Sequence, residues 1–287
     1  MHSYLSSIGF GKVSDRQSLD ALIDEVINTP DVVRRYIKEN NTEFVEYFKD
    51  FADNTGITAV CEEEDDERHL LYYFPYLKGD NVSCRQSVYI NRRVDTEAFT
   101  GMCEDIRIGV SLIFYLQNAV EYLEKQGKDG KAHDIKLTAL AEEGKILLPV
   151  EKKDEYVKEM GKKLKAREQL VKKAKEGDQE AIESLTLEEI DQYASVTKRI
   201  MTEDLFSIID TSFMPCGSES DIYNVIGIIK TVSKEKNPST GETIYLMDIE
   251  VNSMDMGICI NEADLFGEPA VGRRFKGTIW LQGRVEF

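Results

Sequence analysis

The first periodic segment of the chain has the pattern of an amphipathic helix. Its apolar residues recur at helical intervals: Leu19, Leu22, Ile23, Val26 and Ile27. Such a stripe predicts a helix with one buried face. Ser14 and Gln17 stand in front of it at the spacing of a capping box, and Pro30 ends it.

The segment 31–53 fits two patterns. Phe44 and Phe48 have helical spacing, whereas Val45 and Tyr47 also suit a strand. Helix and strand both remain open for this segment, because the two periods cannot be separated over so short a window.

Runs of β-prone residues dominate from residue 57 to residue 149. Strands are predicted over 57–60, 69–76, 87–90 and 108–116, and over 137–141 and 145–149 with a turn at 142–144 between them. The run 108–116 is continuously apolar at its centre, which predicts a central strand buried on both faces.

Residues 62–67 are six consecutive carboxylates at the tip of the first predicted hairpin. A run of acidic residues can attract a hard cation, but calcium loops space their ligands and place a glycine at the sharp turn. A solvated loop is therefore favoured over a cation site.

Residues 151–210 have a helical pattern. Apolar residues keep near-heptad spacing in the first half: Val157, Met160, Leu164 and Val171. Thr186 and Glu189 form a second capping box, and the helix that follows turns Ile190, Tyr193 and Ile200 inward. The pattern predicts a helical hairpin whose many basic residues are interleaved with acidic ones, as on a solvated face.

The apolar stripe of this hairpin must be buried, because each wet large apolar side chain costs roughly 1.5–3 kcal/mol. Either the two helices pack on each other, or the helices over 154–202 form an interface with another protein or a second copy of the chain.

Residues 221–287 have the most regular β pattern. Strands are predicted over 223–232, 244–251, 256–260, 275–281 and 283–287, with turn residues at 237–241. About five short strands with a glycine in the first predict a small closed barrel of the OB type. Trp280 is expected to be at least partly buried in it.

Together these patterns predict an α+β protein. The expected domains are a β-rich α+β domain over 1–150, a helical hairpin or linker over 151–220, and the small β-barrel over 221–287. The hairpin can also pack across both flanking regions.

Charge and cysteine content narrow the classes of function. The chain has 36 basic and 53 acidic side chains, a net charge of −17, which repels nucleic-acid phosphates. Its five cysteines are widely spaced and odd in number, so neither a disulfide framework nor a zinc site is predicted. The amino terminus lacks the pattern of a signal peptide, and no apolar run is long enough to span a membrane. We expect a cytoplasmic protein.

Signatures of catalysis and of cofactor binding are not found. Residues 9–12 resemble the end of a phosphate loop, but the spacing fails and Val13 replaces the required hydroxyl. The three histidines are far apart, and Cys216 is the one cysteine in a turn-like setting. No catalytic, cofactor-binding or metal-binding residue is therefore predicted.

Nucleic-acid binding is the alternative for the predicted barrel. Its basic cluster and one aromatic residue are the candidate contacts: Arg273, Arg274, Lys276 and Trp280. OB-folds bind single strands by such a combination. Acidic residues outnumber basic ones in this stretch, however, which disfavours the site.

Several segments resemble a family of uncharacterised proteins from anaerobic Gram-positive bacteria. The similar segments are 1–10, 73–76, 109–118, 181–189, 267–269, 272–277 and 279–283. The resemblance spans nearly the whole chain and implies a bacterial cytoplasmic protein. It implies no activity, because the family is a domain of unknown function.

The leading hypothesis is a non-catalytic cytoplasmic binding or assembly protein, because the recognisable modules present surfaces and the usual catalytic signatures are missing. The alternative is an OB-like module that binds nucleic acid or a nucleotide. An enzyme with scattered carboxylates is the third hypothesis, because acidic residues are too numerous for the sequence to single out a pair.

We expect no measurable binding of single-stranded DNA or RNA at physiological salt, because the −17 charge repels the phosphate backbone. A salt-dependent fluorescence titration tests this. Micromolar affinity that Arg273→Glu weakens would contradict the expectation.

Overall fold

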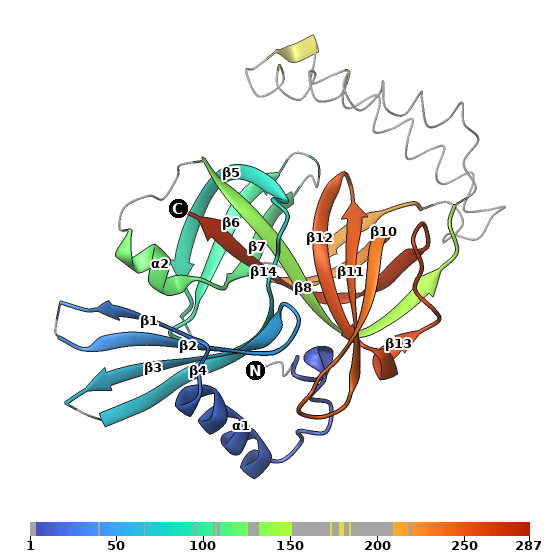
Figure 1. The fold of residues 1–287 in the computed structure, drawn as a ribbon. Helices are drawn as coiled ribbons and strands as arrows, with labels where there is room; N and C mark the ends of the chain where they lie inside the picture. The colour runs from blue at the N-terminus through green and yellow to red at the C-terminus, as the bar shows by residue number, and fades with distance from the viewer. Residues whose placement is uncertain are drawn as a thin grey trace. The chain divides into compact units, whose positions relative to one another are not determined.

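The computed structural model describes residues 4–39, 41–65, 67–94, 96–105, 107, 110–125, 132–150, 209–217 and 220–287, with isolated positions at 173, 178–180 and 184. Contacts divide the chain into two compact units, residues 1–147 with 211–287, and residues 148–210. All helices and strands with described bounds belong to the first unit (Figure 1).

The predicted α+β class is wrong, because the described chain is mostly β. Two α-helices have described bounds, α1 (Arg16–Asn28) and α2 (Ala119–Glu124), together with the short 3-10 turns η1 (Ser6–Ile8) and η2 (Glu262–Asp264). Within the described ranges, no helix is long and apolar enough to cross a membrane. The predicted helical hairpin of 151–220 lies, with its apolar stripe, outside the described residues apart from the isolated positions and its last residues.

Helix α1 confirms the first predicted element, with one change at its start. Asp15 rather than Ser14 caps it, since the Asp15 carboxylate accepts hydrogen bonds from the Ser18 backbone N–H (2.9 Å) and hydroxyl (2.6 Å). Three residues of the predicted apolar stripe are buried: Leu22, Ile23 and Val26. The helix packs against the first sheet.

The first sheet is an antiparallel meander of four strands in chain order. They are β1 (Val32–Ile37), β2 (Glu43–Ala52), β3 (Thr55–Glu64) and β4 (Glu67–Leu77). The segment 31–53, for which the sequence allowed either a helix or a strand, therefore forms two strands, β1 and β2. The predicted hairpin around the acidic run is confirmed as β3 and β4.

Only part of the acidic run matches the solvated loop that we expected, since Glu64, Asp65 and Glu67 are exposed. Glu62 and Glu63 are part of β3, where Lys38 binds Glu62 (2.6 Å) and both Arg35 (3.0 Å) and Arg68 (2.7 Å) bind Glu63. The cations come from other strands of the same sheet, so the acidic residues alone do not indicate these ion pairs.

The second sheet has ten strands, some from the sequence before residues 148–210 and some from the sequence after them. The amino-terminal part supplies β5 (Cys84–Arg92), β6 (Phe99–Asp105), β7 (Val110–Leu116) and β8 (Ala132–Leu147). The carboxy-terminal part supplies β9 (Ser212–Pro215), β10 (Ile222–Lys236), β11 (Thr243–Val251), β12 (Met254–Asn261), β13 (Leu265–Phe266) and β14 (Arg274–Glu286). Strand pairing thus joins residues of the predicted domain 1–150 to residues of the predicted domain 221–287.

Strands β8 and β14 form a long antiparallel ribbon at the centre of this sheet (Figure 1). The outer edge of β8 pairs with β5, then β12, then β13. The outer edge of β14 pairs first with β10 and then with β7. Each ribbon strand therefore serves several neighbours along its length.

The pairings close two five-stranded rings that share the ribbon. One ring runs through β8, β5, β6, β7 and β14, and the other through β8, β12, β11, β10 and β14. The predicted separate carboxy-terminal barrel is therefore wrong. The strands over 222–286 were expected, and Trp280 is buried as predicted, but β8 from the other part of the chain closes their ring.

Two glycines explain why the predicted bounds of β8 and β14 are wrong. Gly144 in the expected turn 142–144 lies inside β8, and Gly283, expected to start a new strand, lies inside β14. A Cβ atom on Gly144 would lie 2.5 Å from the Phe275 ring, and one on Gly283 would lie 2.4 Å from the Phe114 ring. These glycines allow close packing of a buried ring and do not break the strands.

A buried polar network joins the first sheet to the ribbon. The Gln117 side-chain amide donates to the Leu77 carbonyl (3.0 Å) and to the Gln282 side-chain oxygen (2.8 Å). The Gln282 amide donates in turn to the Pro75 carbonyl (2.8 Å), and the Thr138 hydroxyl donates to the Leu77 carbonyl (2.9 Å). The last residues of β4 are thereby tied to β8 and β14.

We expect Gln282→Leu to lower the free energy of unfolding by about 2–3 kcal/mol, because it leaves the buried Pro75 carbonyl without its donor. Urea denaturation followed by circular dichroism measures the change. Gln86→Leu on β5 is the matched control, since Gln86 is half-buried and makes no side-chain hydrogen bond to the described residues. Equal losses in the two variants would contradict the role of the network.

Candidate functional site

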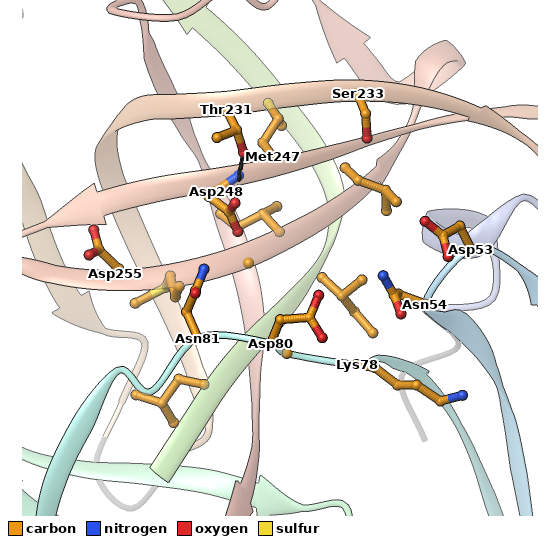
Figure 2. A pocket seen from close by; sticks show the side chains of 17 residues that line it. Asp53, Asn54, Lys78, Asp80, Asn81, Thr231, Ser233, Met247, Asp248 and Asp255 are labelled. Carbon is orange, nitrogen blue, oxygen red and sulfur yellow. Dashed lines mark hydrogen bonds between the residues drawn. The ribbon is translucent and has the colours of Figure 1, made fainter. Parts of the chain in front are cut away.

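A cleft of about 170 Å³ lies where the β2–β3 turn and the segment after β4 face strands β10, β11 and β12 (Figure 2). Its lining combines an apolar floor with an acidic rim. The polar lining residues are Asp53, Asn54, Lys78, Asp80, Asn81, Thr231, Ser233, Asp248 and Asp255. We call this feature the acidic cleft.

The floor of the acidic cleft belongs to the hydrophobic core. Its buried residues are Leu77, Leu137, Met247, Met256 and Ile258. Gly257 brings β12 close to β4, since a Cβ atom there would lie 3.2 Å from Leu77. A ligand in the cleft would thus rest on rigidly packed side chains.

Local backbone structure positions the rim. Asn54 takes a left-handed conformation (φ 56°) in the β2–β3 turn, and its carbonyl accepts a hydrogen bond from the Lys78 N–H (2.7 Å). This bond ties the segment after β4 to the turn. Across the cleft, the Thr231 hydroxyl donates to the Asp248 carboxylate (2.7 Å) beside a β-bulge in β10.

The rim carries an excess of negative charge. Lys78 is bound to Asp50 (2.5 Å), which does not line the cleft. Asp53, Asp80 and Asp255 form no ion pair with the described residues. Figure 2 shows Asp255 toward one end of the lining and Asp53 toward the other, with Asp80 and Asp248 between them. The arrangement favours positively charged ligands.

The cleft does not have the geometry of a metal site. In the described ranges, no group of three carboxylate, thiol or imidazole side chains lies close enough together to hold a metal ion. The four aspartates come from different segments and are spread along the cleft, so they suit separated positive charges better than one small ion.

A second hollow, beside Lys12, is lined by groups that bind one another. The Glu242 carboxylate accepts from the Gly11 N–H (2.9 Å) and from the Asn261 amide (2.8 Å), and Ser6 donates to Asp264 (2.6 Å). These bonds dock the amino-terminal segment on β11 and β12, which is a structural role.

Glu46 is the buried carboxyl group most relevant to the hypothesis of a carboxylate enzyme. It is 1% exposed on β2, and one of its oxygens accepts from the Val120 N–H (3.3 Å). The other oxygen is buried and has no hydrogen-bond partner among the described residues. Burial raises the pKa of Glu46 to about 8, so the group is mostly neutral at pH 7.

Such a pKa would suit acid–base catalysis, but Glu46 lines neither the acidic cleft nor the hollow beside Lys12. Its neighbours are Arg34 and Glu121, which bind each other (2.5 Å). The arrangement supports a structural role for the neutral carboxyl group.

The remaining candidates from the sequence are dispersed. Cys216 is exposed, as its turn-like setting suggested, and the other four cysteines are buried and free. His69 is exposed on β4, whereas His133 is buried on β8 against Phe287.

The residues of the nucleic-acid alternative lie on β14 and just before it, with unequal exposure. Arg274 and Trp280 are buried, and the Trp280 indole donates to Asp221 (2.9 Å) while it stacks on Tyr4. Arg273 donates to the Glu268 carbonyl (2.6 Å), and Lys276 is half-buried. Two of the four residues are thus engaged in the core, and the absence of nucleic-acid binding stays a prediction.

The acidic cleft escaped sequence analysis because its aspartates come from distant segments. Asp53 lies in the β2–β3 turn and Asp80 in the segment after β4, whereas Asp248 and Asp255 lie on β11 and β12. Among 53 acidic residues, no local spacing marks these four. Turn residues such as Asn54 and Asn81 were the only local signal.

These features define a mostly β protein with an acidic cleft at the meeting point of its two sheets. The chain belongs to a family described as a domain of unknown function from an E. rectale gene (DUF3881), which matches residues 5–283. This confirms the family resemblance inferred from the sequence. The comparisons with curated proteins and with solved structures give no match.

We expect Glu46→Gln to stabilise the protein at alkaline pH. A folded pKa of about 8 lies above the unfolded value near 4.5, so wild-type stability should fall as pH rises between these values. Urea unfolding at several pH values should therefore show a few kcal/mol in favour of the variant at high pH and little difference near pH 4.5. A pH-independent difference would contradict the shifted pKa, and Glu268→Gln, at an exposed position, is the control.

Proposed function

We propose that this protein is a non-catalytic cytoplasmic binding protein, and that its acidic cleft takes a small aliphatic amine with two or more ammonium groups. The observation that carries the proposal is the convergence of four aspartates, three of them without an ion-pair partner among the described residues, around an apolar floor.

The charge of the ligand follows from the rim. A cleft lined by one sign of charge with low-dielectric walls concentrates counter-ions of the opposite sign. The aspartates are spread along the cleft, which matches a ligand whose positive charges are separated by a flexible chain. The net charge of −17 adds long-range attraction for any cation.

The size of the ligand follows from the cavity. A cavity of about 150 Å³ holds one benzene molecule, so the cleft of about 170 Å³ suits a ligand of similar size. The methylene groups of a diamine would lie on Met247, Met256 and Leu77, where each buried methylene contributes about 0.8 kcal/mol.

The expected affinity is modest. Each exposed ion pair contributes up to about 1 kcal/mol, and association has its own entropy cost. A dissociation constant between about 0.1 and 1 mM at low salt is consistent with these contributions. The affinity should fall with added salt, because the rim is open to solvent.

Isothermal titration calorimetry with ethylenediamine, putrescine, cadaverine and spermidine tests the proposal. We expect the longer diamines to bind more tightly than ethylenediamine, because they cover more of the floor. The double variant Asp53→Asn/Asp80→Asn should raise the dissociation constant about tenfold, since it removes two unpaired rim carboxylates.

The double variant Asp24→Asn/Glu268→Gln is the matched control, because it changes the net charge equally at two exposed positions outside the cleft. It should leave the affinity within about twofold of the wild type. Equal losses in both double variants, or binding of Mg²⁺ without binding of any amine, would refute the proposal.

A further inference from the structure

Strand β1 forms an open edge of the first sheet (Figure 1). Among the strands that the structure describes, it pairs only with β2, in an antiparallel register that places Val33 opposite Tyr47 and Arg35 opposite Val45. An unpaired strand edge offers a row of N–H and C=O groups to any strand that approaches it.

The residues whose backbone groups face outward can be identified. Lys38 N–H donates to the Thr42 carbonyl (2.9 Å), so the even-numbered residues of β1 bond to β2. Antiparallel ladders alternate, and the groups of Val33, Arg35 and Ile37 therefore face away from the sheet. In the part of the chain that the structure describes, no hydrogen bond ends on these outward backbone groups.

The same strand exposes large apolar side chains. Val33 is 40% exposed and Ile37 is 61% exposed, and the neighbouring Val32 is 47% exposed. Val33 and Ile37 lie on one face of the sheet, because side chains of alternate residues share a face.

The charges on β1 do not protect this edge as charged residues usually do. Arg34 is bound to Glu121 (2.5 Å), and Arg35 is bound to Glu43 (2.7 Å) and Glu63 (3.0 Å). Isolated lysine or arginine charges keep edges apart by repulsion. Here carboxylates of the same chain neutralise them, so they do little to repel another strand.

We propose that β1 pairs antiparallel with β1 of a second copy of the chain, about a two-fold axis at Arg35. The two four-stranded sheets then form one continuous sheet across the dimer. This inference rests on the sheet edge alone and does not depend on the acidic cleft.

In this register, the side chains of one β1 strand complement those of β1 in the second copy. Val33 of each copy lies opposite Ile37 of the other, so the two exposed apolar residues cover each other. Arg34 lies opposite Tyr36 of the second copy, a pair that brings a guanidinium to an aromatic ring. A two-fold axis at Arg34 would instead place Val33 opposite Arg35 and lose the apolar pairs.

The charges at the axis also balance. Each Arg35 faces its symmetry mate, but it already lies between Glu43 and Glu63, and Arg68 binds Glu63 from the other side (2.7 Å). The two copies together contribute equal numbers of arginine and glutamate side chains at the axis. Repulsion between the two Arg35 side chains is thereby offset.

Disulfide trapping tests the register directly. In a Cys216→Ser background, which removes the one exposed cysteine of the described chain, Arg35→Cys should form a covalent dimer with oxidised glutathione. Opposed residues of a strand pair have Cα atoms about 4.5–5.5 Å apart, within the range for a disulfide. Val33→Cys alone should not form a dimer, whereas a mixture of Val33→Cys and Ile37→Cys should.

Sedimentation velocity on the full chain supplies the second measurement. We expect the wild type to dimerise, and Val33→Lys/Ile37→Lys to raise the dimer dissociation constant at least about tenfold while circular dichroism stays unchanged. Leu70→Lys is the matched control, because Leu70 is 47% exposed on β4 at the opposite edge of the same sheet.

The outcomes that would overturn the proposal are distinct. A wild type that stays monomeric at about 100 µM and an Arg35→Cys variant that forms no covalent dimer would each overturn it. Dissociation by Leu164→Glu but not by the β1 variants would place the interface in 154–202 instead. Amine binding by a monomeric protein would refute only the dimer.

Discussion

The ribbon of β8 and β14 is the constraint on which the rest of the structure depends. Its two strands are shared by two closed rings, so neither ring can form without it. The ribbon requires glycine at Gly144 and Gly283, where the buried rings of Phe275 and Phe114 lie against the backbone. A larger residue at either position would displace the Phe275 or Phe114 side chain from its buried position. The strand that carries the substitution, which belongs to both closed sets of strands, would then have to move.

The buried glutamine network extends this dependence to the first sheet. Gln117 and Gln282 connect the end of β4 to the ribbon by donating hydrogen bonds to the buried carbonyl groups of Leu77 and Pro75. The same end of β4 contributes Leu77 to the floor of the acidic cleft. The geometry of the cleft is therefore fixed by the core, while its aspartates lie at the solvent side, where their charge is least costly.

Much of the local structure could be predicted from the sequence, because it is encoded over short distances. The apolar period before Pro30 specified helix α1, and alternation specified the hairpin of β3 and β4 and the strands over 222–286. Errors arose where one local signal has two physical causes. A glycine in a β-prone run marks either a turn or the close approach of a side chain, and only the partner Phe275 distinguishes them at Gly144.

The sequence by itself determined the acidic charge, the family and most of the strand positions. Periodicity, composition and family similarity are properties of neighbouring or aligned residues. The tertiary structure alone decided that the two parts of the chain share one sheet, that Lys38, Arg35 and Arg68 pair with Glu62 and Glu63 of the acidic run, and that four distant aspartates surround one cleft. These features depend on contacts between residues far apart in the chain. Strand pairing within the first sheet brings the cations to the acidic run, and β8 and β14 bring the two parts of the chain together.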